Sequence, residues 1–97
     1  MYIINIKVKN TVSPEQHESL FNQHVEWFKK HFQAGHFLML GPYKNEENAG
    51  VIFADVESRE KLTEILNEDC YYPDLADYEI REFEAKLVAA DFNQKAK

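Results

Sequence analysis

The chain has 97 residues, of which 44% are hydrophobic and 13% aromatic, enough for one compact domain but hardly for a deep pocket enclosed by one subunit. Eleven Lys and Arg against 17 Asp and Glu give a formal charge of −6, which disfavours nucleic-acid backbones and anionic membranes as partners. The single cysteine, Cys70, excludes an intrachain disulfide, and the first residues lack the basic-then-apolar order of a secretory signal. No apolar run approaches the roughly 20 residues of a membrane span, so we expect a soluble, cytoplasmic protein.

The N-terminal part predicts a strand followed by a long helix. Residues 2–9 alternate between apolar and mostly polar side chains, as a half-buried strand requires. Ser13 suits the N-cap of a helix, Pro14 its first position and Gln16 the returning partner of a capping box. The helix is expected to end near residue 34, because Gly35 can adopt the left-handed conformation that terminates helices.

The middle of the chain predicts two strands and a second helix. Residues 36–40 form a strand closed by Gly41 and Pro42, and residues 44–48 are a loop short enough for a hairpin leading into a strand over 49–56. Ser58 then suits the N-cap of a helix that ends near Glu68 and Asp69. The apolar stripe of this helix is narrow and consists of Leu62, Ile65 and Leu66.

The C-terminal part predicts a turn over residues 71–74, a last strand from Asp77 to about Leu87, and a disordered tail at 93–97. The apolar alternation of this strand changes parity, which predicts a β-bulge near Arg81 and Glu82. The order βαββαβ favours an α+β, ferredoxin-like fold, with an antiparallel sheet and both helices on one face. We expect residues 1–88 to form the domain and 89–97 a tail.

The long helix carries three histidines within its apolar arc. At about 100° per residue, that arc spans about 160° and contains Trp27, Leu20, His31, His24, His17, Phe28, Phe21, Phe32 and Val25. Histidines seven residues apart are separated by roughly 10 Å along the axis, so the three cannot share one metal ion. His17 and His31, nearer the helix ends, are expected to be partly buried with local hydrogen bonds. His24 lies mid-helix among aromatic groups and needs a polar partner there.

Asp69 is the candidate for that partner, because it follows the second helix on the same face of the sheet. A carboxylate opposes the negative end of the helix dipole and needs compensation, which an imidazole can supply. The alternative is that Asp69 is a solvated turn residue and not the partner of His24. Cys70, preceded by Glu68 and Asp69, is expected to have a raised pKa, which favours a small buried filler over a nucleophile.

With these residues the chain resembles the YciI-like family of the dimeric α+β barrel type, from the first strand to the last. The match is carried by Gln23-His24-Val25, by the Gly35 break followed by Phe37-Leu38-Met39-Leu40-Gly41-Pro42, and by Asp69-Cys70-Tyr71 before the final strand. The resemblance implies a homodimer and an active site at His24 and Asp69. Two positions depart from the family, since Cys70 replaces a common proline and Leu75 a usual glycine.

The leading interpretation is a small-molecule enzyme in which His24 is the general acid/base and Asp69 orients it. A cyclic or aromatic substrate would undergo proton abstraction, isomerisation or elimination of the dehydrochlorinase type, without metal or cofactor. The residues expected to line its pocket are Trp27, Phe28, Met39 and Tyr71. The alternative is a non-catalytic ligand-binding or interaction module with a structural His24–Asp69 pair. RNA binding is disfavoured by the charge, and Ile3 and Phe83 are candidates for the dimer contact.

Overall fold

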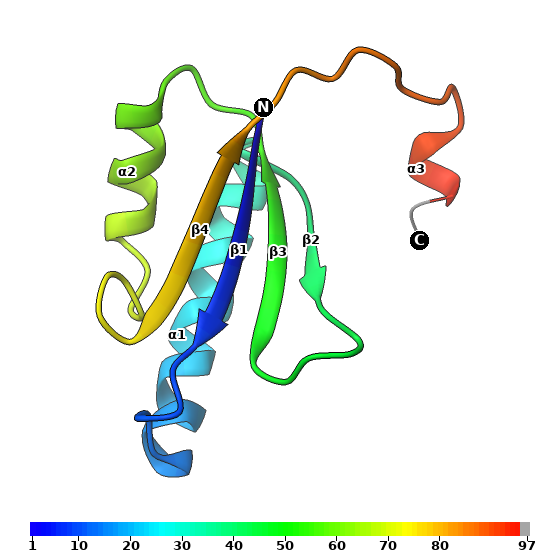
Figure 1. Cartoon of the computed structure of the whole chain (residues 1–97). Helices are drawn as coiled ribbons and strands as arrows, with labels where there is room; N and C mark the ends of the chain where they lie inside the picture. The colour runs from blue at the N-terminus through cyan, green and yellow to red at the C-terminus, as the bar shows by residue number, and fades with distance from the viewer. Residues whose placement is uncertain (96–97) are drawn as a thin grey trace.

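The computed structural model describes residues 1–95, and its element order confirms the βαββαβ, ferredoxin-like arrangement (Figure 1). The sheet is antiparallel and has the strand order β2-β3-β1-β4. The elements, in chain order, are β1 (Tyr2–Val8), α1 (Pro14–Gln33), β2 (Phe37–Pro42), β3 (Ala49–Ala54), α2 (Arg59–Asn67), β4 (Ala76–Glu82) and α3 (Phe92–Lys95).

One face of the sheet carries the hydrophobic core, and in Figure 1 the long helix α1 passes behind it. On the central strand β1, Ile4 lies between Ile52 of β3 and Ile80 of β4. Helix α2 covers this face with three fully buried side chains, Leu62, Ile65 and Leu66. Because each of these side chains is removed from water, this shared apolar layer is the main attachment of the helices to the sheet.

The opposite face of the sheet carries side chains of the other parity. Ile3 of β1 and Met39 of β2 are both register partners of Phe53 on β3. The ring of Phe83, directly after β4, lies edge-on to that of Phe53 at 6.3 Å between centroids. This face therefore has an apolar patch that α1 and α2 do not cover, formed by Ile3, Met39, Phe53 and Phe83.

Helix α1 begins and ends as its sequence predicts. The Ser13 side chain accepts from the backbone N–H of Gln16, and the Gln16 side chain accepts from the backbone N–H of Ser13, completing the capping box. Gly35 follows the helix with φ of 85°, a conformation that suits glycine. Between these ends, the Trp27 indole N–H donates to the carbonyl oxygen of Ile65 at 2.8 Å and ties α1 to α2.

The end of the last strand differs from the prediction. β4 stops at Glu82 rather than near Leu87, and its pairing with β1 is continuous, so the predicted bulge at Arg81 and Glu82 is wrong. The physical reason is that β4 is an edge strand whose one neighbour, β1, begins at Tyr2, the partner of Glu82. The Phe83 backbone N–H still donates to the Met1 carbonyl oxygen, but beyond it the described residues offer β4 no strand to pair with. The change of parity marks where the chain leaves the sheet.

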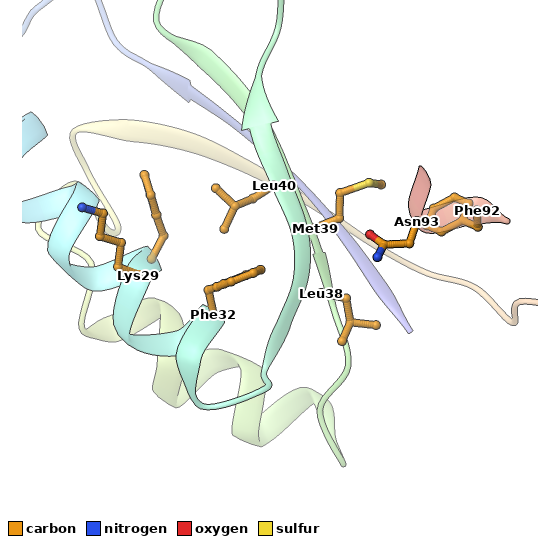
Figure 2. Close-up of a pocket in the computed structure, with 8 residues that line it drawn as sticks. Lys29, Phe32, Leu38, Met39, Leu40, Phe92 and Asn93 are labelled. Atoms are coloured by element: carbon orange, nitrogen blue, oxygen red, sulfur yellow. The ribbon is translucent and has the colours of Figure 1, made fainter. Parts of the chain in front are cut away.

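The C-terminal segment is also more ordered than predicted. Phe92–Lys95 form the short helix α3, so the expected disorder is wrong for residues 93–95, whereas residues 96–97 lie outside those that the structure describes. Phe92 and Asn93 lie beside Met39 on β2 (Figure 2). The exposed segment that precedes α3 includes Leu87, which is 97% exposed.

Because β2 and β3 approach each other closely, we expect substitution by alanine to affect stability very differently at Gly50 and at Gly41. A Cβ atom on Gly50 would lie 2.9 Å from the backbone oxygen of Gly41, whereas a Cβ atom on Gly41 would meet nothing within 4 Å. We expect Gly50→Ala to lower the free energy of unfolding by about 1–3 kcal/mol because the strands must move apart. Urea denaturation measures the change, and Gly41→Ala is the matched control. Equal stability of the two variants would contradict the prediction.

Candidate active site

The centre of the site is a hydrogen bond between α1 and the segment that follows α2. His24 Nδ1 lies 2.8 Å from Asp69 Oδ1. Asp69 is only 2% exposed, so it is a buried residue and not a solvated turn. An ionised carboxylate can only accept hydrogen bonds, so a neutral His24 imidazole bonded to it carries its proton on Nδ1 and its lone pair on Nε2.

A second donor, which the sequence analysis did not single out, completes the environment of this carboxylate. The Tyr78 hydroxyl on β4 donates to Asp69 Oδ2 at 2.7 Å. Burial and the neighbouring Asp69 raise the pKa of Tyr78, so its hydroxyl keeps the proton that it donates. The sequence does carry a signal for this contact, because Tyr78 has the inward parity of Ile80 and a buried tyrosine hydroxyl requires a partner.

Aromatic rings surround the His24 imidazole, as the arc of α1 predicts. Trp27 stacks on it at 5.3 Å between ring centroids, and Phe28 meets it edge-on at 5.4 Å. Tyr71 also meets it edge-on, at 5.2 Å between ring centroids, and the Phe21 ring lies at 6.3 Å. These contacts hold the ring in one orientation and leave its side chain 14% exposed.

Three consecutive residues after α2 are each hydrogen-bonded to α1. Asp69 bonds His24, the Cys70 thiol donates to the carbonyl oxygen of Leu20 at 3.1 Å, and the Tyr71 hydroxyl lies 3.0 Å from Nδ1 of His17. Burial, and then the charge of Asp69, raise the pKa of Cys70, as expected of a thiol beside carboxylates. The cysteine at this departure from the family pattern is therefore a hydrogen-bond donor to the helix.

The second departure, Leu75, is likewise accommodated by the fold. Its side chain is partly buried and packs against the hydrophobic core. Its backbone N–H donates to Tyr71 and its carbonyl oxygen accepts from Lys9, so the segment before β4 is fixed at both ends. The positions of His24 and Asp69 are thus compatible with Leu75.

A cleft of about 950 Å³ opens beside His24, between the N-terminal half of α1 and the β2–β3 hairpin. Its helix side includes Phe21, His24 and Phe28, and its floor is formed by inward-facing strand residues such as Ile6 and Ile52. The hairpin loop, residues 43–48, forms the far rim. The cleft therefore has an apolar interior with an imidazole on one wall.

The charged groups of the cleft lie at its rim and are mainly acidic. Glu18, Glu46 and Glu47 line it, and Lys44 is the one ammonium group among the described residues that do so. Glu46 is paired at 3.1 Å with Lys7, outside the cleft. This balance disfavours a polyanionic ligand and suits a neutral or singly charged one.

The four residues expected to line the pocket divide into two groups. Phe28 and Tyr71 line the cleft beside His24. Trp27 is instead a core residue, only 5% exposed, with its indole N–H turned to α2. Met39 lies on the opposite face of the sheet, and Figure 2 shows it on the far side of β2 from α1, toward Phe92. Successive side chains of a strand point to opposite faces of the sheet, and it is the neighbouring Leu40, not Met39, that lines the cleft beside His24.

His31 is more deeply buried than its place near the helix end predicts. It is 3% exposed, with Nε2 at 3.1 Å from Glu68 and Nδ1 at 3.0 Å from Nδ1 of His36. Glu68 also accepts from Lys30 at 2.8 Å. The chain reverses after Gly35 and lays His36 over the last turn of α1, which excludes water from His31. This cluster lies outside the cleft.

Within residues 1–95, no three His, Cys, Asp or Glu side chains are arranged to hold a metal ion. None of the described helices combines the length and the apolar composition needed to cross a membrane.

The comparisons with known proteins give one family. The family model described as the YCII-related domain matches residues 1–84, which include every strand of the sheet and both residues of the His24–Asp69 pair. No curated protein matches the sequence.

The burial of His31 predicts a pH-dependent loss of stability. Burial lowers the pKa of His31 below its ordinary value of 6.5, so the folded state binds fewer protons than the unfolded state between the lowered pKa and 6.5. The free energy of unfolding should therefore fall as the pH falls through this window. Urea titrations between about pH 7.5 and about pH 5.5 measure it, and His31→Gln should have a shallower slope. An unchanged slope in this variant would contradict the prediction.

Proposed function

The chain belongs to the YCII-related family, and on that premise we propose that it is a small-molecule enzyme in which His24 is the general acid/base and Asp69 orients it. The proposal rests on the buried Asp69 carboxylate, each of whose oxygens accepts one hydrogen bond. One of these bonds comes from the His24 imidazole, which lines the cleft. Asp69 fixes the tautomer of His24 and stabilises the imidazolium formed when Nε2 accepts a proton.

The cleft indicates the class of substrate. Its apolar floor and the rings of Phe21, Phe28 and Tyr71 favour a flat cyclic or aromatic compound, and its acidic rim disfavours a polyanion. Proton abstraction by His24 leads to isomerisation if the proton returns at another atom, and to elimination if a leaving group departs. A positioned acid/base group typically contributes about 10²–10⁴-fold to the rate.

The alternative is a non-catalytic ligand-binding module in which the pair is structural. One observation favours it, because Asp69 connects α1 through His24 and β4 through Tyr78 and so helps to fix the packing of three elements. We also propose a cytoplasmic location, which agrees with the free thiol of Cys70.

A ligand screen tests the cleft and the substrate class together. We expect at least one ring-containing acid, quinone or lactone to raise the Tm of the wild type, because a ligand that binds only the folded state stabilises it. The shift should be smaller for His24→Ala and unchanged for His36→Ala, whose imidazole lies outside the cleft. Equal shifts in wild type and His24→Ala would contradict binding at His24.

The substitution Asp69→Asn separates the catalytic role from the structural one. Asparagine can still bond His24 and Tyr78, so we expect the free energy of unfolding to change by less than about 1 kcal/mol. With a substrate from the screen, kcat/KM should fall by about 10²–10⁴-fold because the imidazolium loses its carboxylate. Glu68→Gln, next in sequence but outside the cleft, is the control and should retain activity. Full activity with a large loss of stability in Asp69→Asn would support the structural role instead.

We further propose that the protein is a homodimer that covers the open sheet face. The proposal is supported by the apolar patch of Ile3, Met39, Phe53 and Phe83, in which Ile3 and Met39 are the register partners of Phe53. Continuous apolar area on one side of a sheet is typical of an interface between subunits.

Sedimentation tests the dimer. At micromolar concentration we expect twice the 11.4 kDa mass of the chain for the wild type, and one chain mass for Phe53→Lys, which places a charge at the centre of the patch. Phe32→Lys, on the helix side of the sheet and 54% exposed in wild type, is the matched control and should remain dimeric. A monomeric wild type would overturn the dimer without bearing on His24.

A further inference from the structure

The cleft contains a second histidine, which the proposed function leaves without a role. His17 lines the cleft on the same helix as His24, and its Nδ1 lies 3.0 Å from the Tyr71 hydroxyl. Tyr71 is fully buried and also lines the cleft. Each imidazole therefore has one nitrogen held by a buried oxygen and the other without a partner among the described residues.

The two imidazoles face different points of the cleft. They are seven residues apart on a straight helix, so they project in nearly the same direction and are separated by roughly 10 Å along its axis. The ring of Tyr71 lies between them, at 6.0 Å from His17 and 5.2 Å from His24 between centroids. One flat ligand in the cleft can therefore meet both rings, but at different atoms.

The hydrogen-bond partners give the two imidazoles opposite tautomers. Within residues 1–95, the Tyr71 hydroxyl has His17 Nδ1 as its one hydrogen-bond partner, and Tyr71 is fully buried. We therefore assign Tyr71 as the donor and His17 Nδ1 as the acceptor, because the reverse direction would leave the buried hydroxyl proton unpaired. Burial raises the pKa of Tyr71 to about 12, which keeps that proton on the hydroxyl at neutral pH. A neutral His17 then carries its own proton on Nε2, as a donor, whereas His24 has a lone pair on Nε2.

We propose that His17 is the electrophile of the site: its neutral Nε2–H donates to a carbonyl oxygen of the substrate while His24 Nε2 removes a C–H proton. This inference rests on the proposed acid/base role of His24. The C–H bond breaks, its proton goes to His24, and its electron pair moves through the conjugated system to the oxygen as an enolate. His17 keeps its proton and stabilises the oxygen charge. Return of the proton at another carbon completes an isomerisation, and loss of an anionic leaving group completes an elimination.

The separation of the two imidazoles narrows the substrate class. An ordinary carbonyl compound holds its acidic C–H adjacent to the carbonyl carbon, close to the oxygen. Two groups spaced along a helix suit a longer arrangement, in which a conjugated double bond lies between the acidic C–H and the carbonyl. We therefore infer a flat, conjugated, unsaturated carbonyl compound as substrate. Tyr71 is a positioning residue in this scheme, because it acts through His17.

Long-range ¹H–¹⁵N NMR of the histidine rings tests the tautomers directly, without a substrate. We expect the Nε2–H tautomer for His17 and the Nδ1–H tautomer for His24 in the wild-type protein. Tyr71→Phe removes the hydroxyl but keeps the ring, and should release His17 to exchange between tautomers while leaving His24 unchanged. An Nδ1–H tautomer at wild-type His17 overturns this inference alone. An Nε2–H tautomer at wild-type His24 overturns the proposed function as well.

A ligand pair tests the donor role of His17. We use 4-nitrophenolate as an enolate-like probe and nitrobenzene as its matched probe without the oxyanion. His17→Phe should weaken phenolate binding by about tenfold or more, as loss of a hydrogen bond to a charged group predicts, and change nitrobenzene binding less than about twofold. Unchanged phenolate binding, or an equal loss for both probes, overturns the inference. In either event the effect of His24→Ala on turnover still tests the proposed function separately.

Discussion

The rest of the site depends on the burial of one carboxylate. Asp69 is 2% exposed and follows the C-terminal end of α2, where the helix dipole is unfavourable for a negative charge. Its two oxygens accept from His24 on α1 and from Tyr78 on β4, so the charge is compensated by two elements that are distant in sequence. Satisfying this one group therefore fixes the relative positions of α1, α2 and β4, and it fixes the orientation of the imidazole at the same time.

The geometry of the cleft follows from the same segment. Asp69, Cys70 and Tyr71 each bond α1, at positions spread over its first three turns. The helix is thereby held to the segment that follows α2, while the cleft opens between its N-terminal half and the β2–β3 hairpin. Apolar burial supplies the stability of the fold, and this short polar segment determines which ring nitrogen of His17 and of His24 is bonded and which is left without a partner among the described residues.

Much of this arrangement could be predicted from the sequence, because it depends on local signals. The capping box of Ser13 and Gln16, the apolar alternation of β1 and the polar requirement of a mid-helix His24 all follow from short-range rules. That Asp69 is the partner of His24 could be predicted from the position of both helices on one face of the sheet and from the family resemblance. These inferences need only the periodicity of each element and the layer in which it lies.

The features that were missed depend on the register between strands and on how chain reversals pack. The end of β4 is determined by where β1 begins, and the side of β2 on which Met39 lies depends on a register irregularity after Phe37. The burial of His31 depends on the position of His36 after the Gly35 reversal. No single segment contains this information, because each case is a contact between two segments.

A double-mutant cycle on His24 and Asp69 tests the central claim most directly, that the buried carboxylate and the imidazole depend on each other. Free energies of unfolding are measured for the wild type, His24→Ala, Asp69→Ala and the double variant. Each single variant leaves the other group buried without its partner, so the account predicts a coupling of about 1–3 kcal/mol. Additive effects, within about 0.5 kcal/mol, would contradict it.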